Sequence, residues 1–204
     1  MGNGTIIKYP DCVKRIQITG KDNYRNLLRI KFEDENGELE NEFMAVCMNP
    51  SKANLEHSDD TVNRLINYAY EQKKYASIAI LNTYSIYETD SKNLPSDKDL
   101  KSDPDKTEEF KRNIEFVVDE ISNLKGTLLL AFGKATQKYM HKAQLQVIDA
   151  AKQAISKNQI IVKKIEGYKY YHHPERCNFK LIEINEIELD ESKKDLWKQP
   201  KMNI

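Results

Sequence analysis

The first forty residues alternate apolar and charged side chains, which is the pattern of strands with one buried face. Two such segments, 15–19 and 27–32, precede the dipeptide Asn36-Gly37. An Asn-Gly pair beside alternating segments favours a tight turn, because both residues tolerate positive φ angles. The pattern therefore predicts an N-terminal β-hairpin over about residues 13–42, with a return strand that runs into 43–48.

From residue 43 the pattern changes to short, nearly continuous apolar runs separated by segments with helical spacing. Uninterrupted apolar runs are typical of strands buried on both faces of a sheet. The predicted strands are 43–48, 78–81, 127–132 and 160–165. The predicted helices are 61–74, 107–124 and 135–156, each with an apolar stripe. This alternation predicts an α/β fold, a three-layer sandwich with a mostly parallel central sheet.

Two segments depart from this order. Residues 89–105 contain Pro95, Pro104 and several Asp and Ser residues, which predicts a long exposed loop. A last alternating segment begins at residue 181, and the charged tail 189–204 is expected to be loosely ordered. At 204 residues the chain suits a single domain, with the hairpin at 13–42 and the α/β core at 43–188.

The charge balance limits the classes of partner. Lys plus Arg and Asp plus Glu each number 32, so the formal net charge is zero. This excludes a protein whose whole surface attracts phosphate, and any nucleic-acid binding must be local. The chain has no signal-peptide pattern and no run of eighteen apolar residues, so we expect no membrane contact. Three separated cysteines suit a reducing, cytoplasmic compartment. For the oligomeric state, we expect a monomer.

Polar residues follow each of the four predicted core strands. In open α/β sheets, ligands bind beyond the carboxyl ends of the strands, so we expect these clusters to converge on one cleft. The clusters are Asn49-Pro50-Ser51, Asn82-Thr83-Tyr84, Gly133-Lys134 and His172-His173-Pro174.

Each cluster has a chemical interpretation beside a simpler structural one. Asn82 offers both a donor and an acceptor, which suits the edge of a nucleobase. Gly133 lets the backbone approach a ligand, and the N–H groups that start the next helix would form an anion site with Lys134. His173, or its neighbour His172, could donate a proton to a leaving group near neutral pH. The same residues also serve as ordinary turn residues and structural histidines, and the sequence leaves both possibilities open.

Several chemistries have no signature in the chain. His57 and His141 show no ligand spacing with a cysteine or with each other, so we expect no metal and no cofactor. Neither a nucleophile-elbow motif nor a glycine-rich phosphate loop is present.

Taken in order, the clusters resemble two families. The segments CMNPS (47–51), AILN (79–82), LLLAFGKATQKY (128–139) and HHP (172–174) resemble the motifs of the uracil-DNA glycosylase superfamily. The chain also resembles the domain of unknown function family 1643 over residues 27–180. That likeness rests on MNPSKA (48–53), DDT (59–61) with Arg64, NTYSIYETD (82–90), AFG (131–133) and His173-Pro174.

The glycosylase resemblance implies a glycosylase-like fold and a pocket for a base. It implies that Asn49 orients a water molecule, while Asn82 and His173 read the base. An amide is no general base, so a carboxylate such as Asp60 is expected to assist catalysis. Substrate contacts are expected from Pro50, Ser51, Asn82, Tyr84, Gly133, Lys134 and Pro174.

The leading hypothesis is therefore hydrolysis of the N-glycosidic bond of a damaged or modified base in DNA. One alternative is a non-catalytic module that binds a nucleotide or a protein in the same place. The other is a hydrolase of free nucleosides or nucleotides, with the 89–105 segment as a lid.

Overall fold

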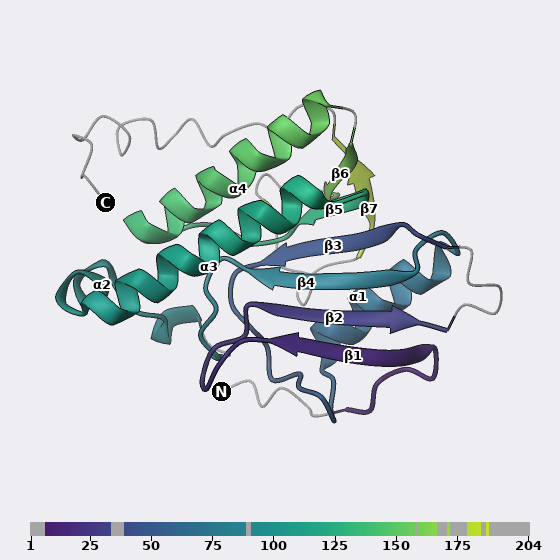
Figure 1. Ribbon diagram of the computed structural model, residues 1–204, viewed down its shortest axis with the longest axis horizontal. Coiled ribbons are helices and arrows are strands. Elements are labelled where there is room, and N and C mark those ends of the chain that lie inside the picture. The colour runs from purple at the N-terminus through teal and green to yellow at the C-terminus, as the bar shows by residue number, and fades with distance from the viewer. Residues whose placement is uncertain are drawn as a thin grey trace.

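A computed structural model of the chain describes residues 7–33, 39–88, 91–157, 159–166, 171, 179–184 and 187. Its central feature is a seven-stranded sheet with the strand order β1-β2-β4-β3-β5-β6-β7 (Figure 1). The strands are β1 (Val13–Thr19), β2 (Leu27–Phe32), β3 (Glu42–Cys47), β4 (Ser77–Asn82), β5 (Gly126–Leu130), β6 (Ile160–Ile165) and β7 (Leu181–Glu183). The four predicted core strands are thus confirmed within two residues at each end.

The sheet is parallel in its centre and antiparallel toward both edges. The pairs β4–β3, β3–β5 and β5–β6 are parallel. The pairs β1–β2, β2–β4 and β6–β7 are antiparallel. The expected mostly parallel sheet is therefore correct for the four core strands only, and the protein has a mixed α/β sheet.

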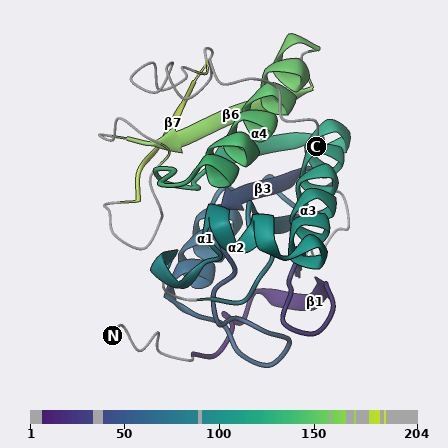
Figure 2. The same ribbon diagram turned by 90° about the vertical axis from the view of Figure 1, so that its left-hand side faces the viewer.

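Helices cover both faces of this sheet. The helix α1 (Asp60–Glu71) lies on one face, and α3 (Pro104–Asn123) and α4 (Lys138–Ser156) lie together on the other (Figures 1 and 2). Alternate residues of β3 feed the two cores: Phe43 and Ala45 pack with the apolar stripe of α1, whereas Met44 and Val46 pack with α3 and α4. Burial on both faces explains why the core strands are almost wholly apolar.

The predicted hairpin is correct in part. The two alternating segments do form strands β1 and β2, but these strands pair with each other, which the predicted turn at Asn36-Gly37 did not imply. The return strand beyond Asn36-Gly37 was wrongly paired, because β4 lies between β2 and β3. Local alternation cannot reveal that β4, which follows β3 in the sequence, is inserted between β2 and β3 in the sheet. The turn residues 34–38 themselves lie outside the described residues.

The expected exposed loop at 89–105 is also corrected. This segment contains a 3₁₀ turn at Ser91–Asn93 and the helix α2 (Asp97–Ser102), and α3 already begins at Pro104. Ser96 and Asp99 form a capping box in which each side chain binds the other residue's backbone N–H. Leu94 and Leu100 are buried against Tyr84 and Phe110. The S-x-x-D pattern and two spaced leucines were the signals of this structure.

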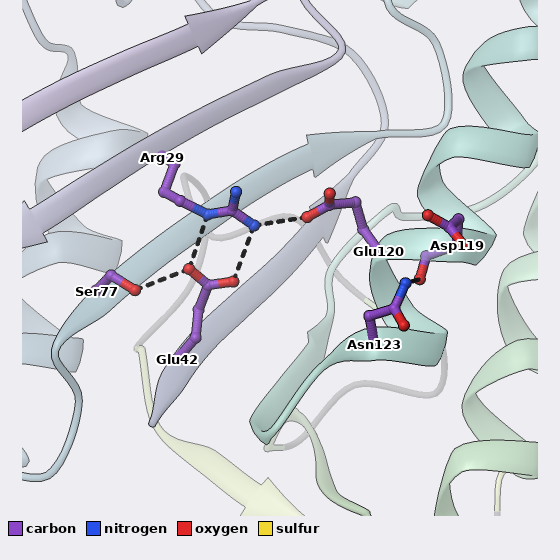
Figure 3. A network of polar contacts seen from close by, with 6 residues as sticks. All are labelled: Arg29, Glu42, Ser77, Asp119, Glu120 and Asn123. Atoms are coloured by element: carbon purple, nitrogen blue, oxygen red, sulfur yellow. Dashed lines mark hydrogen bonds and ion pairs between the residues drawn. The ribbon is translucent and has the colours of Figure 1, made fainter. Parts of the chain in front are cut away.

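A polar network links three strands and a helix at the amino ends of β3 and β4 (Figure 3). Arg29 donates two hydrogen bonds to Glu42, at 2.9 and 3.2 Å, and one to Glu120 of α3 at 2.6 Å. The Ser77 hydroxyl donates to the same Glu42 carboxylate at 2.8 Å. Partial burial lowers the pKa of Arg29, but Glu42 and Glu120 outweigh this effect, so the pKa lies above its ordinary value. Every carboxylate here has a cationic partner.

We expect Glu120→Gln to lower the free energy of unfolding by about 1–2 kcal/mol, because it weakens a partly buried, charge-assisted contact. The control Glu109→Gln removes a single i,i+3 contact of 3.5 Å with Arg112, whose side chain is 63% exposed, and should cost no more than about 0.5 kcal/mol. Urea denaturation of the three proteins measures both values. Equal losses in the two variants would contradict a special role for the network.

Candidate ligand-binding site at the carboxyl ends of the parallel strands

Three of the four predicted clusters meet at one edge of the sheet, toward which β3 and β4 point in Figure 1 and which faces the viewer in Figure 2. The backbone N–H groups of Thr83 and Tyr84 donate to the carbonyls of Cys47 and Met48, at 2.9 and 2.7 Å. A Cβ atom on Gly133 would lie 3.4 Å from Met48 Cε. The ends of β3, β4 and β5 are therefore in direct contact.

The fourth cluster, His172, His173 and Pro174, lies outside the described residues. Its neighbour Tyr171 accepts a hydrogen bond from the Gly133 N–H at 2.5 Å. The chain therefore arrives beside Gly133 directly before this cluster, and the roles of the two histidines stay predictions.

Asn82 is the most unusual side chain at this edge. It is 1% exposed, and neither Oδ1 nor Nδ2 has a hydrogen-bond partner among the described residues. A buried amide without partners costs free energy that an ordinary turn residue would not require. The Asn82 side chain therefore has one donor group and one acceptor that no described residue satisfies.

Asn113 of α3 fixes the backbone beneath Asn82, and the sequence analysis did not identify it. Its Nδ2 donates to the carbonyls of Asn82 at 2.9 Å and Thr83 at 3.3 Å, and its Oδ1 accepts from Asn26 at 3.1 Å. Asn113 is completely buried. A polar residue on the apolar stripe of a predicted helix was the available signal.

The cluster after β3 is held by the main chain. The Asn49 amide nitrogen donates to the carbonyl of Glu88, which fixes the orientation of the amide. Pro50 is buried, and the Ser51 hydroxyl is buried without a partner in the described structure. Asn49 therefore offers an oriented amide, and Ser51 a buried hydroxyl, in the loop that follows the strand paired with Asn82.

The two acidic residues before α1 have different environments. Asp60 is the first residue of α1 and is exposed, so its assisting role stays a prediction. Asp59 is 6% exposed and caps α1: its two oxygens accept from the N–H groups of Val62 and Ala53, at 3.0 and 3.1 Å. Asp59 thus shapes the loop that carries Asn49 and Ser51.

Arg25 is a buried cation beneath the same loop, and no sequence motif pointed to it. It is 1% exposed, donates to the Ala53 carbonyl at 2.7 Å, and lies 5.5 Å from the centre of the Tyr87 ring. Its Nε is buried without a partner in the described structure. Burial lowers the pKa of Arg25, and the charges of Tyr87 and Asp59 oppose this shift. A guanidinium stays charged at neutral pH, so Arg25 gives this region a positive potential.

Cys47, the last residue of β3, pairs with Asn82 across the parallel ladder. Burial raises the pKa of the Cys47 thiol to about 12, although Arg25 lowers it. The thiol is therefore neutral at pH 7 and is unsuited to act as a nucleophile.

The structure corrects the expected anion site at the start of α4. The helix begins at Lys138, and the N–H groups of Lys138 and Tyr139 both donate to the carboxylate of Asp97, at 3.0 Å each. These donors are therefore occupied by a side chain of α2. Gly133 does adopt a positive φ of 72°, which the tight turn after β5 requires, and Lys134 is exposed.

Tyr84 connects the strand end with this helix start. Its ring centre lies 4.9 Å from that of Phe110, and its hydroxyl is buried without a partner in the described structure. Burial raises the pKa of Tyr84, and the negative charge of Asp97 adds to the shift. The hydroxyl therefore stays protonated at neutral pH and remains a hydrogen-bond donor.

Amide, hydroxyl and guanidinium groups are the donors that this edge presents. Within the described residues, no three His, Cys, Asp or Glu side chains gather where they could hold a metal ion. No helix in the described part of the chain is long and apolar enough to cross a bilayer.

The fold and these groups define a mixed α/β protein with a candidate ligand site where its parallel strands end. The family described as "Protein of unknown function (DUF1643)" matches residues 25–175, and the chain belongs to this family. The match begins at Arg25 and spans Asn49, Asn82 and Gly133. No curated protein and no solved structure matches the chain.

We expect Asp59→Asn to lower the free energy of unfolding by about 1–3 kcal/mol, because it removes a negative charge that favours the buried Arg25 cation and one of the two hydrogen bonds that the Asp59 carboxylate accepts. The matched control is Asp103→Asn, which changes the exposed N-cap of α3. Asn caps a helix as well as Asp does, so both variants keep a capping bond, and the control loses a carboxylate charge that pairs only with Lys106 among the described contacts. Thermal and urea unfolding should show a large loss for Asp59→Asn and little change for the control. Similar losses would indicate that Asp59 acts only as a cap.

Proposed function

We propose that this edge binds a nucleobase and that the protein hydrolyses the N-glycosidic bond of a damaged or modified base in DNA, on a uracil-DNA-glycosylase-like fold. The observation that carries the proposal is the buried amide of Asn82, which has no hydrogen-bond partner in the described part of the chain. A nucleobase edge presents adjacent donors and acceptors in one plane, which an asparagine amide can bind with both of its groups.

The surrounding groups suit the charges that develop in this reaction. When the N-glycosidic bond breaks, the bonding electron pair leaves with the base and positive charge develops on the sugar. The Asn82 NH₂ group would donate to a base oxygen as it becomes negative. The buried positive charge of Arg25 lowers the pKa of Cys47, the ladder partner of Asn82, and would stabilise the same anion.

The water that attacks the sugar requires an orienting group. The Asn49 amide is held by the Glu88 carbonyl and would orient that water, with Asp60 as the assisting carboxylate. His173 and Pro174 would complete the base pocket, as the glycosylase resemblance implies. Ser51, with Gly133 and Lys134, would contact the sugar or backbone phosphate.

One observation favours a free nucleoside or nucleotide as the substrate instead. Leu94 and Leu100 fasten the segment 91–102 against Tyr84 and Phe110, so a short helical cover lies beside the same edge. A cover suits a small ligand better than a long strand. The net charge of zero also supports a small ligand, because no general attraction for DNA assists binding.

We expect single-turnover assays to leave abasic sites in oligonucleotides that carry uracil, an alkylated base or a hydroxymethylated base. Asn82→Asp should lower the rate by at least about 100-fold, because it replaces the donor to the base with a repelling charge. Asn49→Ala and His173→Ala should each abolish cleavage. Asn123→Ala is the control and should keep the rate, because Asn123 is the last residue of α3 and lies near the amino ends of the strands rather than their carboxyl ends (Figure 3).

The same assay with free nucleosides and mononucleotides separates the alternatives. Release of the base from a monomer but not from DNA would favour the small-molecule hydrolase. Thermal stabilisation by a mononucleotide, without cleavage of any substrate, would leave a binding module and would contradict the proposed reaction.

A further inference from the structure

The start of α4 is capped by a side chain that is distant in the sequence. The residue at the N-cap position, Gln137, makes no capping hydrogen bond with its own side chain. Instead, the two oxygens of Asp97 accept from the N–H groups of Lys138 and Tyr139 at 3.0 Å each. A carboxylate supplied from 41 residues away in the sequence therefore neutralises the positive end of a 19-residue helix.

Asp97 sits on an element that could release it without unfolding. It is the first residue of α2, a helix of six residues that is stabilised locally by the Ser96–Asp99 capping box. Leu100 anchors this helix to the α3 side independently of Asp97. The contact between Asp97 and α4 can therefore open while the capping box and the leucine anchor remain.

Tyr84 supplies a second observation at the same place. Its side chain is 3% exposed and packs with Leu100 of α2 and Met140 of α4, and its hydroxyl has no partner in the described structure. Each oxygen of Asp97 accepts from one of the two N–H groups, and neither accepts from the Tyr84 hydroxyl in the described structure. The buried hydroxyl is therefore a third donor that the Asp97 carboxylate leaves unused.

We propose that the start of α4 is a binding site for a phosphoryl group, which Asp97 fills in the free protein and which the phosphate enters by displacing Asp97. A phosphoryl group has three terminal oxygens, so it can accept from both N–H groups and from the Tyr84 hydroxyl. Its larger negative charge also interacts more strongly with the helix end. This inference deepens the proposed function, because it names the phosphate subsite of a nucleotide whose base would lie at Asn82.

The intramolecular carboxylate explains how such a site would be kept selective. Free anions must compete with Asp97, so a bare phosphate binds weakly. A ligand that also contacts Asn82 gains enough affinity to displace it. The apparent affinity for phosphate equals the intrinsic affinity multiplied by the fraction of molecules in which Asp97 has left α4.

The experiment titrates inorganic phosphate into the wild-type chain and into Asp97→Ala, with binding followed by calorimetry and by the shift of the unfolding temperature. Removing the competitor should raise the affinity for phosphate at least about tenfold. Asp97→Asn keeps the shape of the side chain and removes its charge, so it should show a smaller gain and serves if the alanine variant folds poorly. Asp105→Asn removes one exposed acidic charge from the first turn of α3 and should behave as the wild type.

The double variant Asp97→Ala with Tyr84→Phe tests the third donor. It should lose most of the gained affinity, because a hydrogen bond to a charged oxygen is removed while the ring packing on Phe110 is kept. No gain in Asp97→Ala and Asp97→Asn, or an equal gain in Asp105→Asn, would overturn the proposal. Phosphate binding is measured without any base or cleavage step, so this result is independent of the Asn82 assays.

Two further titrations identify the source of the phosphate. A 5′-mononucleotide that gains more affinity than inorganic phosphate in Asp97→Ala would identify a free nucleotide. A short single-stranded oligonucleotide that gains more than the mononucleotide would identify the DNA backbone. Both results support the site, and they differ only in the molecule that carries the phosphoryl group.

Discussion

The buried guanidinium of Arg25 is the constraint on which the candidate site depends. It joins three segments that are far apart in the sequence: its own loop between β1 and β2, the loop after β3 through the Ala53 carbonyl, and the chain after β4 through the Tyr87 ring. Its backbone N–H also donates to the Ser85 carbonyl at 2.7 Å. Burial of a charge requires compensating contacts. If these segments separated, the cation would be exposed to solvent or would lose those contacts. The loop that carries Asn49 and Ser51 is therefore fixed against the sheet.

The two ends of the parallel strands are built on opposite principles. At the amino ends, Arg29, Glu42, Glu120 and Ser77 satisfy one another in a closed network. At the carboxyl ends, polar atoms of Asn82, Ser51 and Arg25 are buried without partners in the described structure. Proteins place such local conflicts where function requires them, and satisfied networks elsewhere supply the compensating stability. This asymmetry within one sheet is the physical reason to locate the site at the carboxyl ends.

The sequence predicted the parts of this arrangement that depend on local patterns. Continuous apolar runs located the four core strands, and the strand–helix alternation placed Asn49, Asn82 and Gly133 at one edge. The insertion of β4 between β2 and β3 had no local signal, because sheet order depends on contacts between distant segments. Arg25 and Asn113 were missed for the same reason, because the role of an isolated polar residue depends on the distant segments that pack around it. The capping box at Ser96 and Asp99 was visible in the sequence, but the prolines and acidic residues around it favoured a loop.

The two proposed subsites lie on opposite sides of one strand end. Residues Ile78 and Ile80 of β4 pack toward α1, and by alternation Asn82 lies on the same face of the sheet. Cys47 also packs on this face, and the charge of Arg25 acts on it. Tyr84 instead packs with α2, α3 and α4. A ligand that used both would cross the end of β4, with an uncharged planar part beside Asn82 and an anionic part at the start of α4. A nucleotide has this division within one molecule, because the sugar separates its base from its phosphate. When that ligand is absent, the Asp97 carboxylate compensates the positive end of the α4 dipole. A protein without net charge can therefore keep an anion site that does not attract every anion.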